Sequence, residues 1–312
     1  MPSDVAHSPA LRSVAVRRRG EVLDQDLIVV EEPLEIRLDG KPLVVTMRTP
    51  GDDEELAAGF LHAEGMIAGG AQIASLRAVA GAREAAATGG AARIKVTAFA
   101  GDRVEVTLAG AAGRPAPRSA TVEPEREFRA TAACGVCGKE SIEDLDQELP
   151  SISPVECRPV LFEALPERLR AAQTLFEATG GIHAAGIFTL DGELLRVRED
   201  IGRHNAVDKV IGHFVLRDEV PLRDRILVVS GRAGFELVQK ALMAAIPAMV
   251  SVGAASSVAV DMATAAGMSL YSFAGRGRGN LHVARAEIAA RQGDESKLTD
   301  AQVKALIEAG RR

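Results

Sequence analysis

The sequence predicts an α/β protein in which a small N-terminal α+β domain precedes a layered α/β domain. In the first part, Leu34, Ile36 and Leu38 alternate with polar residues, which is typical of a strand with one buried face. In the second part strand-like and helix-like segments alternate, and Ile226–Val229 is continuously apolar, as expected of a strand covered on both faces. This alternation favours a layered α/β arrangement.

The N-terminal domain is expected to span residues 27–115, after a flexible N-terminus at residues 1–26. Within it, Asp52 is followed three residues later by Glu55. At this spacing two side chains can cap the amides that open a helix. We therefore predict a helix over residues 53–67.

A hairpin is predicted in this domain, with residues 94–96 pairing with residues 104–108 across Gly101 and Asp102, because glycine and aspartate favour tight turns. The segment that follows begins with alanine, glycine and proline and then becomes charged. Residues 116–158 are therefore expected to form a linker with a mobile cysteine-containing loop.

The C-terminal domain is expected to span residues 159–290, with a further helix at residues 291–312. Pro166 is expected to open its first helix, because proline is favoured at the first helical position, and Gly180 to end it. The rest of the domain is predicted to alternate, with strands at 182–190, 193–198, 225–229, 247–252 and 268–273 and helices at 204–215, 234–245 and 257–266.

The composition excludes several classes of protein. The net charge is −6, from 37 Lys and Arg against 43 Asp and Glu, so no bulk basic field marks a nucleic-acid binder. No run approaches the ~18 consecutive apolar residues that a membrane span needs. Three cysteines in 312 residues build no disulfide framework, which favours a reducing compartment. We therefore expect a cytoplasmic protein that binds neither nucleic acid nor a membrane.

The strongest local feature is the pair Cys134 and Cys137 in the motif CGVCGK. Such a pair can be half of a zinc site, a redox dithiol or two incidental thiols. Flanking glycines indicate an exposed loop, and the nearby Lys139 favours the thiolate, which is the reactive form. Cys157 stands alone and is expected to be an ordinary residue.

A zinc deaminase is the rival interpretation of these cysteines. His62 and Glu64 form an H-x-E triplet, and zinc deaminases combine H-x-E with P-C-x-x-C. Here Ala133, rather than proline, precedes Cys134. The triplet also fits the solvated face of an amphipathic helix, so both interpretations stay open at this point.

Two further segments suit an anion. The stretch 199–209 lies at a strand-to-helix junction, where Arg203, His204 and the helix amides can meet a negative group. The alternative there is a capped helix start, with Asn205 as the cap and Asp208 three residues later.

The second anion-binding candidate is a pair of glycine-rich turns, at residues 230–234 and 275–279. Glycine lets a backbone approach a phosphate, and Arg276 and Arg278 supply paired donors. Phe273 lies just upstream and can stack on a base. The alternative is a flexible basic turn.

Taken together, these segments resemble the FdhD family of formate dehydrogenase accessory sulfurtransferases, from about Val29 to Val283. The resemblance rests on five motifs in the family's order: RTPGDDEELAAGFLHAEGMI (48–67), CGVCGKE (134–140), EDIGRHNAVDKVIG (199–212), SGRAGFELVQKA (230–241) and SFAGRGRGN (272–280).

The resemblance implies a sulfur carrier that takes sulfane sulfur from a cysteine desulfurase. It implies delivery of that sulfur to the molybdenum, or tungsten, of a bis(molybdopterin guanine dinucleotide) cofactor, for which a guanine nucleotide is a mimic. The sulfurated cofactor then goes to the catalytic subunit of formate dehydrogenase. Family members are cytoplasmic homodimers, and their C-terminal domain is similar to the cytidine deaminase fold.

By motif position, Cys134 would carry the persulfide and Cys137 would be an auxiliary thiol. Arg203, His204 and Asn205 are expected to line the cofactor cavity, and no residue is assigned to a metal. The resemblance assigns the cofactor-binding loop to Phe273, Ala274, Gly275, Arg276, Gly277 and Arg278.

Three functions are therefore compared: a sulfur carrier, a zinc deaminase, and a cofactor chaperone without catalysis. The carrier predicts sulfur on Cys134, the deaminase predicts stoichiometric zinc, and the chaperone predicts nucleotide binding that survives loss of both thiols.

Overall fold

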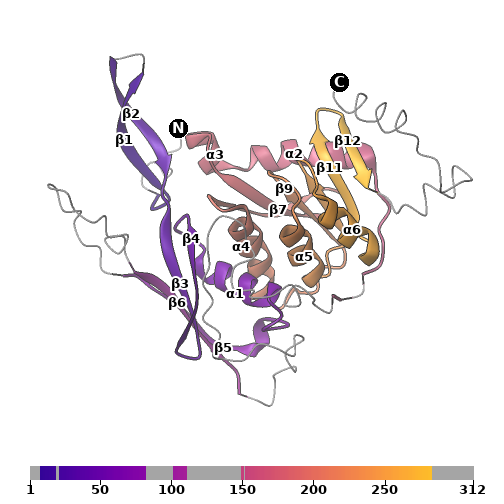
Figure 1. Cartoon of the computed structure of the whole chain (residues 1–312), viewed down its shortest axis with the longest axis horizontal. Coiled ribbons are helices and arrows are strands. Elements are labelled where there is room, and N and C mark those ends of the chain that lie inside the picture. Colours follow the sequence, from indigo (N-terminus) through magenta and orange to yellow (C-terminus); the bar gives the residue numbers. More distant parts are fainter. Residues whose placement is uncertain (1–7, 19–20, 82–100, 111–148, 151, 283–312) are drawn as a thin grey trace, which may run out of the picture.

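The computed structural model describes residues 8–18, 21–81, 101–110, 149–150 and 152–282. These residues form a six-stranded sheet, a four-stranded sheet and a two-stranded sheet. Figure 1 shows the six-stranded sheet and its helices on one side of the molecule and the two smaller sheets on the other. The mixed α/β fold that the sequence predicts is confirmed.

The six-stranded sheet forms the centre of the C-terminal part. Its order is β12-β11-β10-β9-β7-β8. Strands β9, β10 and β11 are parallel to one another, whereas β7 runs antiparallel to β9. The strands are β7 (His183–Thr189), β8 (Leu194–Asp200), β9 (Arg225–Val229), β10 (Ala248–Ser251), β11 (Ser269–Gly275) and β12 (Arg278–His282).

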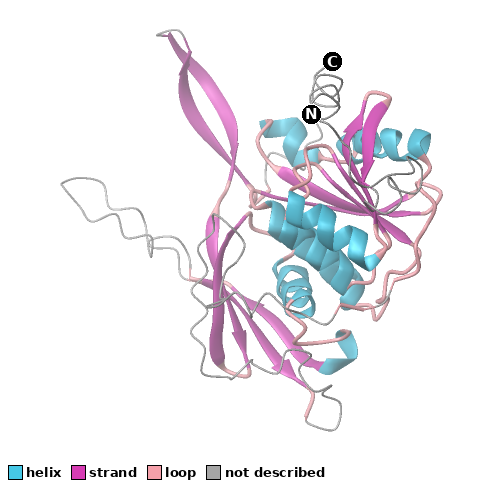
Figure 2. Ribbon diagram, turned by 45° about the vertical axis from the view of Figure 1, so that its right-hand side comes forward, coloured by secondary structure: helices cyan, strands magenta, loops and turns pink. Residues whose placement is uncertain are grey.

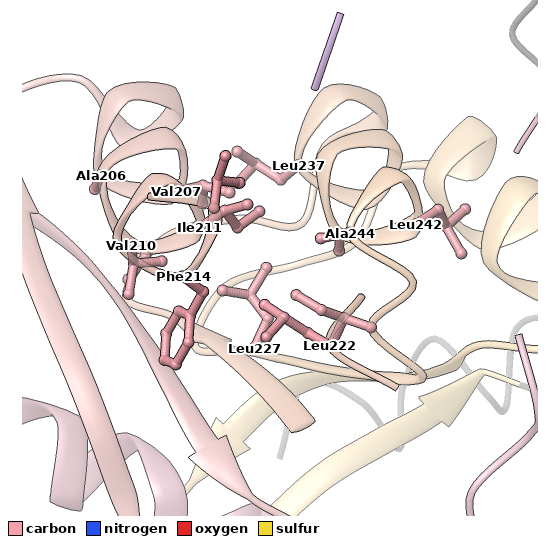
Figure 3. Close-up of a cluster of buried hydrophobic side chains, with 14 of the residues drawn as sticks. Ala206, Val207, Val210, Ile211, Phe214, Leu222, Leu227, Leu237, Leu242 and Ala244 are labelled. Atoms are coloured by element: carbon pink, nitrogen blue, oxygen red, sulfur yellow. The ribbon is translucent and has the colours of Figure 1, made fainter. Parts of the chain in front are cut away.

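Helices cover both faces of this sheet. The helices are α2 (Pro159–Ala171), α3 (Thr174–Thr179), α4 (Arg203–Val215), α5 (Phe235–Met243) and α6 (Ser257–Ala266). Helices α4, α5 and α6 bury their apolar residues in one core cluster, and α2 packs in a second cluster with Phe188 and Tyr271. Figure 3 shows Val207 and Ile211 of α4 facing Leu237 of α5. The sheet is therefore the middle layer of three.

The four-stranded sheet of the N-terminal part has the order β4-β3-β6-β5. Its elements, with the helix that follows β4, are β3 (Glu32–Leu38), β4 (Lys41–Arg48), α1 (Asp53–Ala63), a 3-10 turn (Gly70–Gln72), β5 (Ile73–Val79) and β6 (Asp102–Leu108). Figure 2 shows α1 between this sheet and the helices of the C-terminal part. One buried apolar cluster runs from Leu34 and Val104 through α1 into α4.

Two glycines allow α1 to pack closely on α4. A Cβ added at Gly59 would overlap the backbone carbonyl of Asp208, and one added at Gly212 would overlap that of Glu55. Any side chain at either position would force the helices apart. The two parts of the chain are thus joined by direct backbone contact.

Three local predictions are wrong. The N-terminus predicted to be flexible contains the hairpin β1 (Leu11–Arg18) and β2 (Glu21–Val29), which projects from the body of the molecule (Figure 1).

The second error concerns the first helix of the C-terminal part, which Pro166 does not open. This helix begins at Pro159, with Pro166 inside it. It forms there because Phe162, Leu165 and Leu169 are buried against the sheet.

The third error concerns the pairing of β6. The sequence predicts a hairpin with residues 94–96, which lie outside the described residues. Strand β6 instead pairs antiparallel with β5 and parallel with β3, because the backbone groups along both edges of a central strand need hydrogen-bond partners. The predicted strand at 225–229 and the helices at 204–215 and 257–266 are confirmed to within one residue.

In the part of the chain that the structure describes, no helix is both long enough and apolar enough to cross a membrane. The C-terminal helix predicted at residues 291–312 and most of the predicted linker at 116–158 lie outside the described residues.

Candidate functional site

The candidate site lies at the edge of the central sheet where the parallel strands end. The loops after β9 and β10 continue the ladder beyond the strands: Gly253 N–H donates to Gly231 O at 2.9 Å, and Ala233 N–H donates to Ala254 O at 3.0 Å. Helices α5 and α6 begin directly after these loops. Open α/β sheets commonly bind ligands at such an edge.

The predicted cofactor-binding loop leaves this edge from β11. Phe273 N–H donates to Gly253 O at 3.1 Å, so β11 is joined to the loop after β10. The pairing of β11 with β12 shifts register between Ser272 and Gly275. At this bulge Phe273 has a φ of 54°, in the left-handed region. A phenylalanine adopts this conformation only at a cost, which is typical of functional positions.

Three side chains of this loop face solvent, whereas Ala274 is buried in the core. Phe273 is 51% exposed, and Arg276 and Arg278 are also exposed. Arg276 has a φ of 53° and Gly277 one of 68°, so the turn between the strands is tight and left-handed. The exposed ring of Phe273 therefore lies next to a turn that contains Arg276 and Arg278.

The start of α4 brings Arg203 and His204 to the same edge. His204 Nε2 lies 2.8 Å from Glu236 Oε2 at the start of α5. His183, the first residue of β7, lies near Arg203 and His204. Burial lowers the pKa of the His183 imidazole, and electrostatic interactions with Arg203 and His204 lower it further. The edge is thus rich in positive charge.

A second line of contacts connects the two predicted binding segments. A Cβ added at Gly231 would lie 3.5 Å from the His183 ring, and one added at Gly253 would lie 2.9 Å from Arg232 Cγ. Arg232 therefore lies against the loop that also holds Phe273. Sequence reasoning missed His183 altogether and noted Arg232 only as part of a glycine-rich turn.

Four arginines at this edge have no carboxylate partner among the described residues. They are Arg203, Arg232, Arg276 and Arg278. Elsewhere the buried Arg48 is paired with Asp53 at 2.9 Å, and the half-buried Arg198 is paired with Glu55 at 2.6 Å. Guanidinium groups without a partner acid suit the oxygens of phosphate.

Asn205 points away from this edge, into the protein. Its Nδ2 donates to Met47 O at 2.7 Å and to Asp200 Oδ1 at 3.0 Å. The proposed capping role is wrong, because the residue that caps α4 is Gly202 and no side chain caps it. Asn205 ties β4 to the start of α4 instead.

Cys134 and Cys137 lie outside the described residues. Cys157 is a half-buried thiol. Burial raises its pKa, and the carboxylate of Glu163 raises it further. A raised pKa keeps a thiol protonated and unreactive at neutral pH, which agrees with an ordinary structural residue.

The H-x-E triplet is not on a solvated helix face. His62 is 6% exposed, because α1 is enclosed between α4 and the four-stranded sheet. Across the described segments, no three His, Cys, Asp or Glu side chains gather as a metal ion would require. The two cysteines of the zinc interpretation fall outside those segments.

A cavity lies elsewhere, at the start of α1. It has a volume of about 680 Å³, and acidic side chains line it from Asp52 to Glu55, together with Arg217. Four carboxylates repel an anion. The cavity therefore does not fit a phosphate-containing ligand, and the arginine-rich edge does.

Comparison with known proteins identifies the chain. A family model described as the FdhD/NarQ family matches residues 29–289. The chain belongs to the FdhD/NarQ family. Similar curated proteins are named sulfur carrier protein FdhD. The one from Corynebacterium efficiens is 49% identical over 258 residues, which are 82% of this chain and 87% of the relative.

Other family members are nearly as similar. The protein of the same name from Streptomyces coelicolor is 46% identical over 80% of this chain and 84% of its own length. A crystal structure from Desulfotalea psychrophila, described as that of a formate dehydrogenase accessory protein, matches with a TM-score of 0.61. It is 22% identical and covers 88% of this chain and 96% of that one, so it supports the fold alone.

Proposed function

We propose that this member of the FdhD/NarQ family is a sulfur carrier that serves formate dehydrogenase. In this proposal a cysteine desulfurase supplies sulfane sulfur to Cys134, and the sulfur passes to the molybdenum or tungsten of a bis(molybdopterin guanine dinucleotide) substrate. The names of relatives that are 41–49% identical support the carrier role. The motif CGVCGK supplies the thiols.

The arginine-rich edge is proposed to hold the cofactor. The observation that carries this assignment is the presence of Arg203, Arg232, Arg276 and Arg278 along one edge of the sheet, none of them paired with an acid among the described residues. The cofactor has two pyrophosphates, whose oxygens accept paired hydrogen bonds from guanidinium groups. Phe273, half exposed at the same edge, would stack on a guanine, and a guanine nucleotide should bind as a mimic.

The thiol chemistry follows from two exchange steps. The Cys134 thiolate attacks the outer sulfur of the donor persulfide, the donor S–S bond breaks, and the donor leaves as a thiolate. Cys137 can then attack Cys134 Sγ, which forms a disulfide between the two cysteines and releases the outer sulfur as sulfide. The two thiols lose two electrons, and the sulfane sulfur gains them.

The finer features of the family are proposed for this chain as well. The strand order β8-β7-β9-β10-β11, with β7 antiparallel to β9, supports a likeness to the cytidine deaminase fold. A cytoplasmic homodimer that meets a desulfurase and the catalytic subunit of formate dehydrogenase is the matching cellular arrangement. Sulfurtransferase activity is the matching reaction class.

Intact-protein mass spectrometry tests the carrier role. Wild type, Cys134→Ala and the matched control Cys157→Ala are incubated with a cysteine desulfurase and cysteine. We expect wild type and Cys157→Ala to gain about 32 Da, the mass of one sulfur, and Cys134→Ala to gain none. Tightly bound zinc with no sulfur gain would favour the deaminase. Guanine-nucleotide binding with no sulfur gain in any variant would favour the chaperone.

A further inference from the structure

Asp200 is a buried carboxylate directly behind the arginine-rich edge. It is the last residue of β8 and is 0% exposed. Its oxygens accept hydrogen bonds from the start of α4: Gly202 N–H lies 2.8 Å from Oδ1, and Asn205 Nδ2 lies 3.0 Å from Oδ1. Asp200 therefore holds the turn that immediately precedes Arg203.

The other oxygen of Asp200 is held by a lysine of α4 and by the N-terminal part of the chain. Lys209 Nζ lies 2.7 Å from Oδ2, and Thr49 N–H donates to Oδ2 at 3.1 Å. Lys209 is 1% exposed, and its ammonium also donates to Thr49 O at 2.8 Å. A buried ion pair of this kind is stable only when further hydrogen bonds satisfy both partners, and here they do.

Thr49 brings the N-terminal part of the chain into this network. It follows the last residue of β4, and its Oγ1 accepts a hydrogen bond from Ile201 N–H at 3.1 Å. Both the backbone and the side chain of Thr49 thus hold the turn between β8 and α4. The backbone before Arg203 is fixed from both sides.

The cap of α4 also has no free space. A Cβ added at Gly202 would lie 2.9 Å from Asn205 Nδ2 and 3.4 Å from Asp200 Oδ1. Because Gly202 N–H and Asn205 Nδ2 both donate to Asp200 Oδ1, a shift of this turn would break hydrogen bonds to Asp200. Arg203 and His204 follow this turn directly, so their backbone positions depend on it.

We propose that Asp200 is a positioning residue for the anion, acting with Lys209 and Thr49. It does not touch the ligand. It sets the direction in which the first turn of α4 presents Arg203 and the helix amides to a phosphate. The proposal rests on the proposed function, since it takes the arginine-rich edge as a nucleotide-phosphate site.

The proposal makes a prediction that a merely structural role does not. Asp200 acts through the groups that meet phosphate, so its loss should weaken a ligand with phosphates and spare one without them. A general loss of structure would weaken both ligands and lower the unfolding temperature. GDP and guanosine form the matched pair of probes.

The test uses isothermal titration calorimetry on the full chain. The double variant Asp200→Asn with Lys209→Met removes both charges together, so neither is left unpaired. The control is Asp208→Asn with Lys240→Met, which removes a second buried ion pair, 2.7 Å long, that joins α4 to α5. We expect the first variant to bind GDP about tenfold more weakly, a loss of about 1.4 kcal/mol, and guanosine within about twofold of wild type.

The outcomes separate the two proposals. GDP affinity within about twofold of wild type, or an equal loss for GDP and guanosine, overturns the positioning role. Equal affinities of wild-type protein for GDP and guanosine would instead contradict the phosphate site itself. If the double variant does not fold, Thr49→Val removes only the acceptor for Ile201 N–H. The same selective loss of GDP binding is then expected, and its absence overturns the proposal.

Discussion

Glu55 and His213 face each other across the packing of α1 on α4, with 2.8 Å between Oε1 and Nδ1. Arg198 donates to both oxygens of Glu55, at 2.6 and 2.9 Å, and Arg196 Nε lies 3.1 Å from His213 Nε2. A neutral imidazole with its proton on Nδ1 donates to Glu55 and accepts from Arg196. Arg217 Nη1, which also lies 2.9 Å from Nδ1, then donates to the backbone oxygen of His213. A protonated ring would place its Nε2–H against the Nε–H of Arg196.

This pair predicts a stepwise loss of stability in acid. Burial lowers the pKa of His213 below 6.5. Arg196 and Arg217 lower this pKa further, whereas Glu55 raises it. Burial alone would raise the pKa of Glu55, but hydrogen bonds from Arg198 and His213 outweigh it and hold that pKa below 4.5.

The sign follows from proton uptake. The unfolded chain binds a proton at His213 more readily than the folded chain, so the free energy of unfolding falls as the pH drops below 6.5. Glu55 adds a second loss below pH 4.5 for the same reason. We expect His213→Gln to flatten the first step and Glu55→Gln the second, in denaturant titrations at several pH values. Profiles parallel to that of wild type would contradict both assignments.

Gly212→Ala is expected to destabilise the protein by about 3 kcal/mol, because the added Cβ overlaps the Glu55 backbone and overpacking of a core costs this much. Alanine favours a helix over glycine by about 1 kcal/mol, so propensity alone predicts the opposite sign. Chemical denaturation measures the difference. Gly101→Ala is the control, since nothing lies within 4 Å of a Cβ added there.

Phe273→Ala is expected to weaken GDP binding by roughly tenfold to a hundredfold, as stacking of a base on an aromatic ring contributes about 1–3 kcal/mol. The unfolding temperature should change little, because half of the ring is exposed. Leu281→Ala on β12 is the control, with a side chain that is 40% exposed. Equal GDP affinities of the two variants would show that the ring does not stack.

Arg232→Gln is expected to weaken GDP binding about tenfold, the effect of one charge-assisted hydrogen bond to phosphate. Arg158→Gln makes the same change of charge beside α2, where Arg158 lies 3.4 Å from Asp191. Calorimetric titration of both variants with GDP separates a local contact from a change in net charge. A similar loss in both would remove Arg232 from the site.

Much of the fold can be predicted from local pattern. The run Ile226–Val229 is a strand because continuous apolar residues need cover on both faces, and this strand is confirmed. Phe273, Arg276 and Arg278 lie at an exposed turn, as their glycine-rich surroundings indicate. Their role in binding the cofactor stays a prediction, as do the roles of Cys134 and Cys137.

Other features depend on partners distant in sequence. Asn205 has the spacing of a helix cap, but Met47 and Asp200 take its hydrogen bonds. His62 has the spacing of an exposed helical residue, but α1 is enclosed by its neighbours. Pro166 was expected to open a helix, but burial of Leu165 and Leu169 against the sheet stabilises a helix that runs through it.

Local sequence pattern is sufficient to predict the class of fold, the order of the strands and helices in the C-terminal part, and the motifs that resemble the family. These depend on the periodicity of neighbouring residues, which a single segment carries. The meeting of Asp200, Lys209 and Thr49 behind the arginine-rich edge is seen only in the folded chain. Thr49 and Lys209 are 160 residues apart, and a hydrogen bond across that separation depends on the packing of whole elements, which no local pattern encodes.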